Sequence, residues 1–273
     1  MDSAVITNIL SYGPAFLLIA ARALAMIETA PLLSSDSIPQ AAKLALAGFA
    51  AYAVFPQAAA SAIGIGQFDA YGLNFVYLVI GEGIIGLIIG FFLTIIFSAF
   101  STAGQFFSLL MGFGASETFD PLSQIENPLL GQYLNLVAML VFLSVGGFRE
   151  LFLGGFWRSV ETINIVSLVE GRERTLGMLL SGLSRLFLDA MIISMPILGT
   201  LFLTSLATGL ISKAAPQINI LSEGFPISIT VAFLLIFAAL PFMTEAFARV
   251  VDAGFASVET LYTRIGLPIG GTQ

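Results

Sequence analysis

The chain has 273 residues, of which 58% are hydrophobic and 10% charged, and its mean hydropathy is +0.99. Soluble domains average about 45–50% apolar and about 25% charged residues, so the composition excludes a water-soluble globule and indicates a membrane protein. A net charge of −7 argues against nucleic-acid binding, and the absence of both Cys and His removes disulfides, the usual zinc ligands and imidazole bases.

Long stretches without a charged residue recur along the chain, and each is long enough for a helix to cross a bilayer. We therefore expect an all-α membrane protein with about six hydrophobic helices or helical hairpins. Their expected positions are near residues 4–27, 41–63, 73–100, 129–147, 178–211 and 225–248. Pro196 lies in the middle of the fifth stretch and predicts a kink there. The first stretch is retained, because its acidic start is untypical of a cleaved signal peptide.

Loops are expected between these stretches, at residues 31–39, 64–72, 111–128, 149–175 and 212–226. Residues 149–175 carry four arginines and form the most charged segment. With six crossings both termini share a side with this segment, so the positive-inside rule predicts that both lie in the cytoplasm. An odd number of crossings would reverse the argument for one of them.

Five charged residues fall within or near the apolar stretches: Arg22, Glu82, Arg185, Asp189 and Glu245. Each would cost about 2.5–3.5 kcal/mol facing lipid at the bilayer centre, so each needs a partner, an interface or a protein environment. Arg185 and Asp189 are four residues apart and are expected to pair on one helix face. No partner is evident for Arg22, Glu82 or Glu245. A proton or ion pathway is one interpretation, and packing between subunits is the one we favour.

Glycines are characteristic of two further segments, one around residues 86–90 and one at residues 102–121. Gly86 and Gly90 form a small-xxx-small pattern that permits close helix packing, within one chain as readily as between chains. The segment from Thr102 to Pro121 mixes bulky apolar side chains with glycines. Irregular backbone at membrane depth must be buried in protein or line a cavity. This segment is therefore either a deformable apolar seal or an ordinary interfacial loop.

Short fragments in a fixed order carry a resemblance over most of the chain. They are Arg22 with TAPLL at 29–33, Ile38-Pro39 with Lys43, Gly86-xxx-Gly90-Phe91, Ala103-Gly104-Gln105, Met111-Gly112-Phe113, Asp120-Pro121, Ala138-Met139-Leu140 with Phe142-Leu143, Ala215-Pro216-Gln217-Ile218-Asn219 and Gly224-Phe225-Pro226. In this order they resemble the FliR family, the R subunit of the flagellar type III export gate, whose injectisome counterpart is SctT. One position departs, because Gly147-Phe148 stands where family members often have Gly-His.

The resemblance implies a non-catalytic, pore-forming subunit of the bacterial inner membrane at the flagellar basal body, without a cofactor. FliR-like subunits assemble with several copies of FliP and FliQ into a closed helical ring, with FlhB around its cytoplasmic side and FlhA as a further partner. Unfolded flagellar subunits pass through the middle. Residues 1–175 would form a P-like part and 176–273 a Q-like helical hairpin with a C-terminal tail. Kinked hairpins would replace some simple crossings.

The resemblance also places a pore plug in the loop near residues 104–121. The residues carried over to it are Phe106, Leu109, Leu110, Met111, Gly112, Phe113 and Gly114. Gly112 and Gly114 would be its hinges. Three alternatives remain: the injectisome counterpart, which the Gly224-Phe225-Pro226 form disfavours, a stand-alone solute transporter or channel, and a membrane enzyme. We find no internal repeat of the transporter kind and no catalytic motif.

Overall fold

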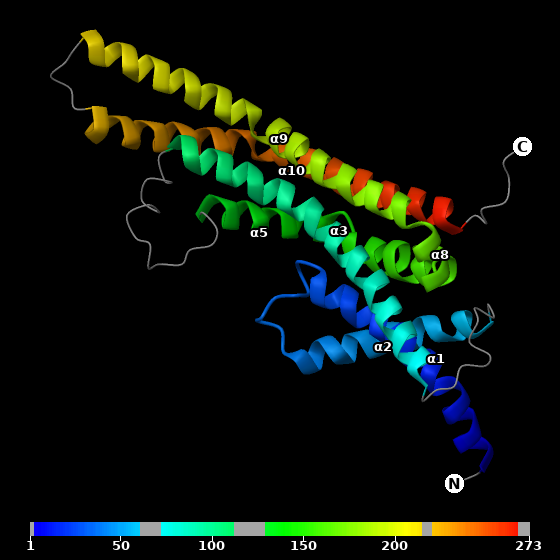
Figure 1. Ribbon diagram of the computed structural model, residues 1–273. Coiled ribbons are helices and arrows are strands. Elements are labelled where there is room, and N and C mark those ends of the chain that lie inside the picture. The colour runs from blue at the N-terminus through cyan, green and yellow to red at the C-terminus, as the bar shows by residue number, and fades with distance from the viewer. Residues whose placement is uncertain (1–2, 61–71, 112–128, 215–219, 267–273) are drawn as a thin grey trace, which may run out of the picture. The chain divides into compact units, whose positions relative to one another are not determined.

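The computed structural model describes residues 3–60, 72–111, 129–214 and 220–266, and every regular element in this part of the chain is a helix. This confirms the expected all-α class. The elements are α1 (Ser3–Thr29), α2 (Gln40–Ala60), α3 (Leu73–Met111), α5 (Leu129–Ser144), α6 (Gly147–Arg149), the π-helix η2 (Glu150–Trp157), α7 (Arg158–Thr162), α8 (Ile165–Glu170), α9 (Arg172–Ala214) and α10 (Ile220–Gly266) (Figure 1).

Several helices extend further than the apolar stretches that predicted them. α3 continues to Met111 and α10 covers Ile220–Gly266, so the parts of the expected loops at 104–111 and 220–226 are helical. Most of the expected loop at 149–175 is helical as well. These loop predictions were wrong because a helix continues wherever its backbone groups keep their hydrogen bonds, even after the apolar run has ended.

Among the described residues, four helices are long and apolar enough to cross a membrane, or five if the broken pair Leu130–Ser144 and Gly147–Thr162 counts as one span. All six expected apolar stretches are helical, in α1, α2, α3, α5, α9 and α10, although not every one of them is long and apolar enough to cross a membrane by itself. α2 does not qualify, because Lys43, Tyr52, Pro56 and Gln57 lower the mean hydropathy of its apolar residues. The side of the membrane on which each terminus lies stays a prediction.

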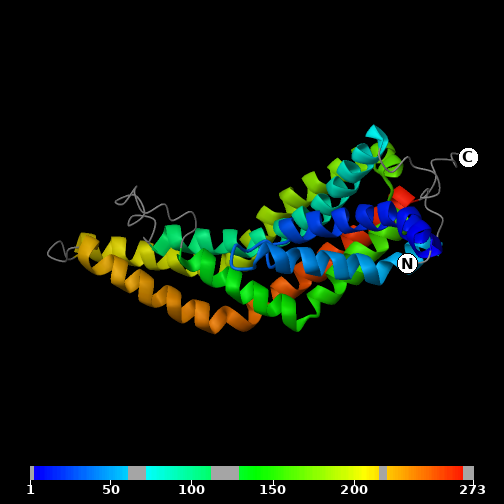
Figure 2. The ribbon, with the colours of Figure 1, turned by 90° about the horizontal axis from the view of Figure 1, so that it is seen from below.

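The chain divides into two compact units. The first unit comprises residues 1–95, 146–182 and 253–273, and the second comprises 96–145 and 183–252. In the first unit, α1 and α2 pack against each other as an antiparallel pair (Figures 1 and 2). Phe55 of α2 lies edge-on against the rings of Tyr12 and Phe16 of α1, at centroid distances of 6.0 and 6.1 Å.

A short helical region with unusual backbone completes the first unit. Gly146 takes φ 74°, in the left-handed region that glycine adopts without a steric penalty. α5 ends two residues before it, at Ser144. The π-helix η2 follows. α8 begins with a capping box, in which Asn164 Oδ1 accepts from the Ser167 N–H at 2.8 Å and Ser167 Oγ accepts from the Asn164 N–H at 3.0 Å.

Aromatic packing forms the core of the second unit. The rings of Phe97 and Phe100 on α3 lie 5.6 and 4.7 Å from the ring of Phe247 on α10, and Phe97 also lies 5.3 Å from Phe142 of α5. All four side chains are buried. Offset and edge-to-face pairs at such distances contribute beyond the apolar area that they bury, so this cluster holds three helices together.

Candidate functional site

Arg22 of α1 is the centre of a buried polar node that joins three elements of the first unit. Its guanidinium contacts Oε2 of Glu82 on α3 at 2.6 Å. It also donates to Ser159 Oγ of α7 at 3.1 Å and to the Ile163 carbonyl at 2.9 Å. Ser159 Oγ in turn donates to the Phe156 carbonyl at 2.6 Å. The fixed fork of arginine donors suits this arrangement, because one planar group reaches three acceptors at once.

The node answers the question that the sequence left open. Arg22 and Glu82 were each without an evident partner, and they are each other's partner across 60 residues of chain. The two side chains are only 3% and 15% exposed. A signal was present, because two intramembrane charges of opposite sign on separate helices cost least when they neutralise each other. The contributions of Ser159 and of the Ile163 backbone had no sequence signal.

Glycines allow α1 and α3 to approach closely beside this node. A Cβ added to Gly86 would overlap the Arg22 carbonyl oxygen, and one added to Gly90 would overlap Thr29 Oγ1 and lie 2.7 Å from the Met26 carbonyl oxygen. The hydroxyl of Thr94 on α3 donates to the Thr29 carbonyl at 2.9 Å. The small-xxx-small pattern therefore serves packing within the chain, which was one of its two expected uses.

The turn after α1 is held by a second buried cation. Lys43 of α2 is 2% exposed, and its Nζ lies 3.1 Å from Glu28 Oε2 and 3.1 Å from the Ser34 carbonyl oxygen. The Thr29–Leu33 motif thus lies between two helices whose charged residues contact each other across the turn. This explains why a lysine can sit on an otherwise apolar helix.

The last turns of α10 contact η2 and α7. Tyr262 is buried and its hydroxyl donates to the Gly155 carbonyl at 2.8 Å. Glu259, one turn earlier, forms an ion pair with Arg158. These two contacts attach the C-terminal end of α10 to the arginine-bearing region around η2.

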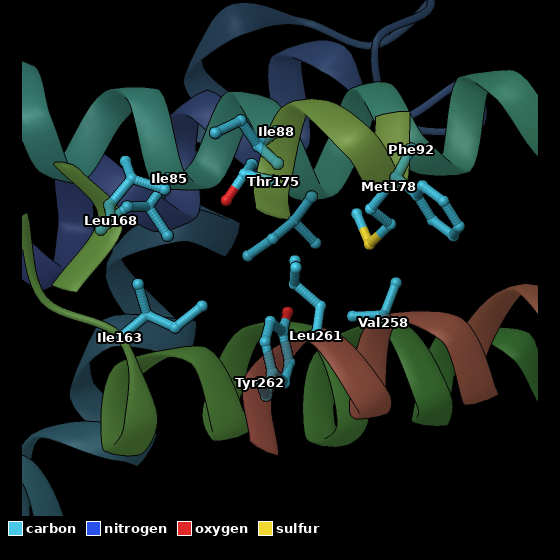
Figure 3. Close-up of a pocket in the computed structure, with 11 residues that line it drawn as sticks. Ile85, Ile88, Phe92, Ile163, Leu168, Thr175, Met178, Val258, Leu261 and Tyr262 are labelled. Atoms are coloured by element: carbon cyan, nitrogen blue, oxygen red, sulfur yellow. The ribbon is translucent and has the colours of Figure 1, made fainter. Parts of the chain in front are cut away.

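A small apolar cavity lies beside this contact (Figure 3). In Figure 3 it lies between α3 and the end of α10, with Thr175 and Met178 of α9 alongside. Its free space is about 20 Å³, which is room for about one water molecule. The lining is almost wholly apolar, so this cavity is a packing gap and offers no binding chemistry.

The other charged residues singled out earlier pair within their own helices in the second unit. Arg185 Nε lies 3.8 Å from Asp189 Oδ2, which confirms the expected pair. Glu245, for which no partner was evident, lies 3.6 Å from Arg249 one turn later. Both arginines and Glu245 are largely exposed on the chain, whereas Arg22 and Glu82 are not.

The part of the expected plug that the structure describes is the end of α3. Phe106, Leu109, Leu110 and Met111 are helical, so this part is not an irregular loop. Leu109 and Leu110 are 68% and 45% exposed, whereas Met111 is fully buried. Gly112, Phe113 and Gly114 lie outside the described residues.

Together these features describe a helical membrane protein whose buried polar groups contact one another between helices. The buried charged groups of the first unit, Arg22, Glu82 and Lys43, are used in ion pairs and hydrogen bonds between helices. Among the residues that the structure describes, no three acidic side chains lie together as a metal site would require. The class that this defines is an all-α, multi-span membrane protein whose polar interior serves helix packing.

Comparison with known proteins gives the family. Residues 14–254 match the family model "Bacterial export proteins, family 1". The chain is 31% identical to the flagellar biosynthetic protein FliR of Escherichia coli K12, over 81% of this chain and 82% of the relative. It is 33% identical to FliR of Borreliella burgdorferi, over 71% of this chain and 73% of the relative. It is 28% identical to FliR of Bacillus subtilis, over 95% of this chain and 98% of the relative. The chain belongs to this family of bacterial export proteins, the FliR family.

Proposed function

We propose that this chain is a non-catalytic, pore-forming subunit of the flagellar type III protein export gate. The observation that carries the proposal is the family match over residues 14–254, together with a FliR relative aligned over 95% of the chain. The absence of His and Cys from the sequence and the structural use of its buried charges support a role without catalysis.

The proposed partners are several copies of FliP and FliQ, with FlhB and FlhA, and unfolded flagellar subunits in transit. Apolar surface that the chain leaves uncovered supports such an assembly. The most apolar windows of α9 and α10 have mean hydropathies of 2.0 and 2.3, yet only 33% and 17% of their residues are buried within the chain. We further propose that residues 1–175 form a P-like part and 176–273 a Q-like hairpin.

The proposed location is the inner membrane at the flagellar basal body, with the C-terminus in the cytoplasm. Support for this orientation no longer depends on the number of crossings. The Arg158–Glu259 ion pair and the Tyr262 hydrogen bond attach the end of α10 to the arginine-rich region of residues 149–174. Excess Arg and Lys mark the cytoplasmic side of a membrane protein.

We also propose that the segment near residues 104–121 occludes the pore. Leu109 and Leu110, at the end of α3, leave apolar side chains exposed on the chain and available for such a seal. Replacing both Gly112 and Gly114 by Val should stiffen the segment, because valine restricts the backbone far more than glycine. The variant should assemble and secrete less, and normal secretion by the assembled variant would contradict the hinge hypothesis.

Two experiments test the function itself. Deleting the gene should abolish flagellin secretion and motility, and a plasmid copy should restore both. Expressing the chain with tagged FliP and FliQ of the same genome, followed by native mass spectrometry, should give one large complex with several copies of each. A stable monomer or dimer that ignores both partners, or normal secretion in the deletion strain, would refute the proposal.

A further inference from the structure

In the second unit, α3 and α5 touch backbone to backbone at Gly104 and Gly131. A Cβ added to Gly104 of α3 would lie 2.7 Å from Gly131 Cα, 2.8 Å from the Gly131 nitrogen and 2.9 Å from the Leu130 carbonyl oxygen. All three atoms belong to the backbone of α5, so no side chain can rotate away to make room. Even alanine at residue 104 would force α3 and α5 apart.

The contact is not symmetric. A Cβ added to Gly131 would meet the Ser101 carbonyl oxygen at 3.3 Å, Ser101 Oγ at 3.5 Å and Gln105 Cγ at 3.9 Å. The 3.3 Å contact requires a shift of a few tenths of an ångström, and the other two are ordinary van der Waals distances. The two glycines of one crossing therefore differ sharply in what they tolerate, and Gly131 provides a matched control for Gly104.

The position of the crossing gives it a consequence beyond packing. Gly131 lies in the first turn of α5, and Gly104 lies about two helical turns before the end of α3. In those two turns Phe107 and Met111 are fully buried, whereas Leu109 and Leu110 are exposed. The crossing thus sets both the spacing of the two helix ends and the rotation of α3 that directs the leucines outward.

From this geometry we propose that Gly104 is a positioning residue, whose contact with Gly131 is a fixed crossing that holds the ends of α3 and α5 at one spacing during export. The inference rests on the proposed function as an export-gate subunit. The crossing stays closed while protein passes, and its role is to keep Leu109 and Leu110 at the wall of the pore, where they seal it against small ions. Widening it misplaces Leu109 and Leu110 without removing them.

The first test compares Gly104→Ala with Gly131→Ala in the assembled complex. Gly104→Ala should assemble with its partners, lose secretion and let small ions or a small dye leak across the membrane. Gly131→Ala should secrete and seal like the parent. The leak is the decisive readout, because a purely structural defect would lower the amount of complex without opening it. Two equal phenotypes, or a Gly104→Ala complex that seals and secretes normally, would overturn the proposal.

The second test does not depend on Gly104→Ala folding. The chain has no cysteine, so the pair Ser101→Cys with Gly131→Cys can be cross-linked without competing thiols. The 3.5 Å between Ser101 Oγ and the added Cβ is compatible with disulfide geometry. Oxidation should link the two helices and leave secretion unchanged. Failure to form the disulfide, or a reversible block of secretion on oxidation, would show that the crossing is absent or must open.

A deletion strain separates failure of this inference from failure of the proposed function. If secretion survives loss of the whole chain, the export role is wrong. If secretion requires the chain but both glycine variants behave alike, only the role of the crossing is wrong.

Discussion

Replacing Arg22 by Ala should destabilise the first unit by about 3 kcal/mol or more. Arg22 and Glu82 are 3% and 15% exposed and lie 2.6 Å apart, and breaking such a buried pair from one side costs about 3–5 kcal/mol. The Ile163 carbonyl would also lose the guanidinium as a donor. Ser159 would keep its bond to the Phe156 carbonyl, so the hydroxyl adds little to the total.

Related variants separate the sources of this loss. Arg22→Lys keeps the charge but not the three-way fork, so it should fall between the parent and Arg22→Ala. Arg22→Met combined with Glu82→Leu should cost less than Arg22→Met alone, because no charge is then left buried without a partner. Arg149→Ala is the control, since that arginine lies in the same unit, is 76% exposed and is 3.1 Å from Glu150. It should change stability by no more than about 1 kcal/mol.

The chain provides its own probe for these measurements. Trp157 is its single tryptophan, and it lies in η2 two residues before Ser159, with its indole N–H donating to Glu161 at 2.9 Å. Tryptophan emission of the full chain in detergent micelles, followed during unfolding with sodium dodecyl sulfate, would report the unfolding free energy of this region. If Arg22→Ala and Arg149→Ala cost the same, the reasoning from burial is refuted.

Three further changes follow from the packing. Gly86→Ala should disrupt the α1–α3 contact, because its Cβ would overlap the Arg22 carbonyl oxygen. Gly83→Ala is the control and should leave this contact unchanged, because its Cβ would meet nothing within 4 Å. The same unfolding experiment measures the stability of both variants. Tyr262→Phe should cost about 0.5–1.5 kcal/mol, since the carbonyl that it leaves keeps a backbone donor. Phe247→Ala should cost about 3–5 kcal/mol through the cavity it opens in the buried aromatic cluster, and a loss below about 1 kcal/mol by thermal unfolding would contradict that packing.

Local relationships in this protein could be predicted from the sequence. The apolar stretches predicted helices that the structure contains, and Arg185 and Asp189 pair as their four-residue spacing indicates. The residues at which helices end were harder to predict from the sequence. α3 continues to Met111 through a segment whose glycines had suggested irregular backbone, because glycine lowers helix propensity by only about 1 kcal/mol and packing on a neighbouring helix outweighs this.

The sequence by itself determined the class of the protein, because its uncharged apolar stretches of about 20 residues fit a membrane as helices, whose backbone hydrogen bonds close within each stretch. Which charges and glycines meet was decided only by tertiary structure. Arg22 pairs with Glu82, which is 60 residues away in the sequence, and Gly104 contacts Gly131 on another helix. The periodicity of a helix fixes which side chains share its own face, but it contains no information on which face of another helix will pack there.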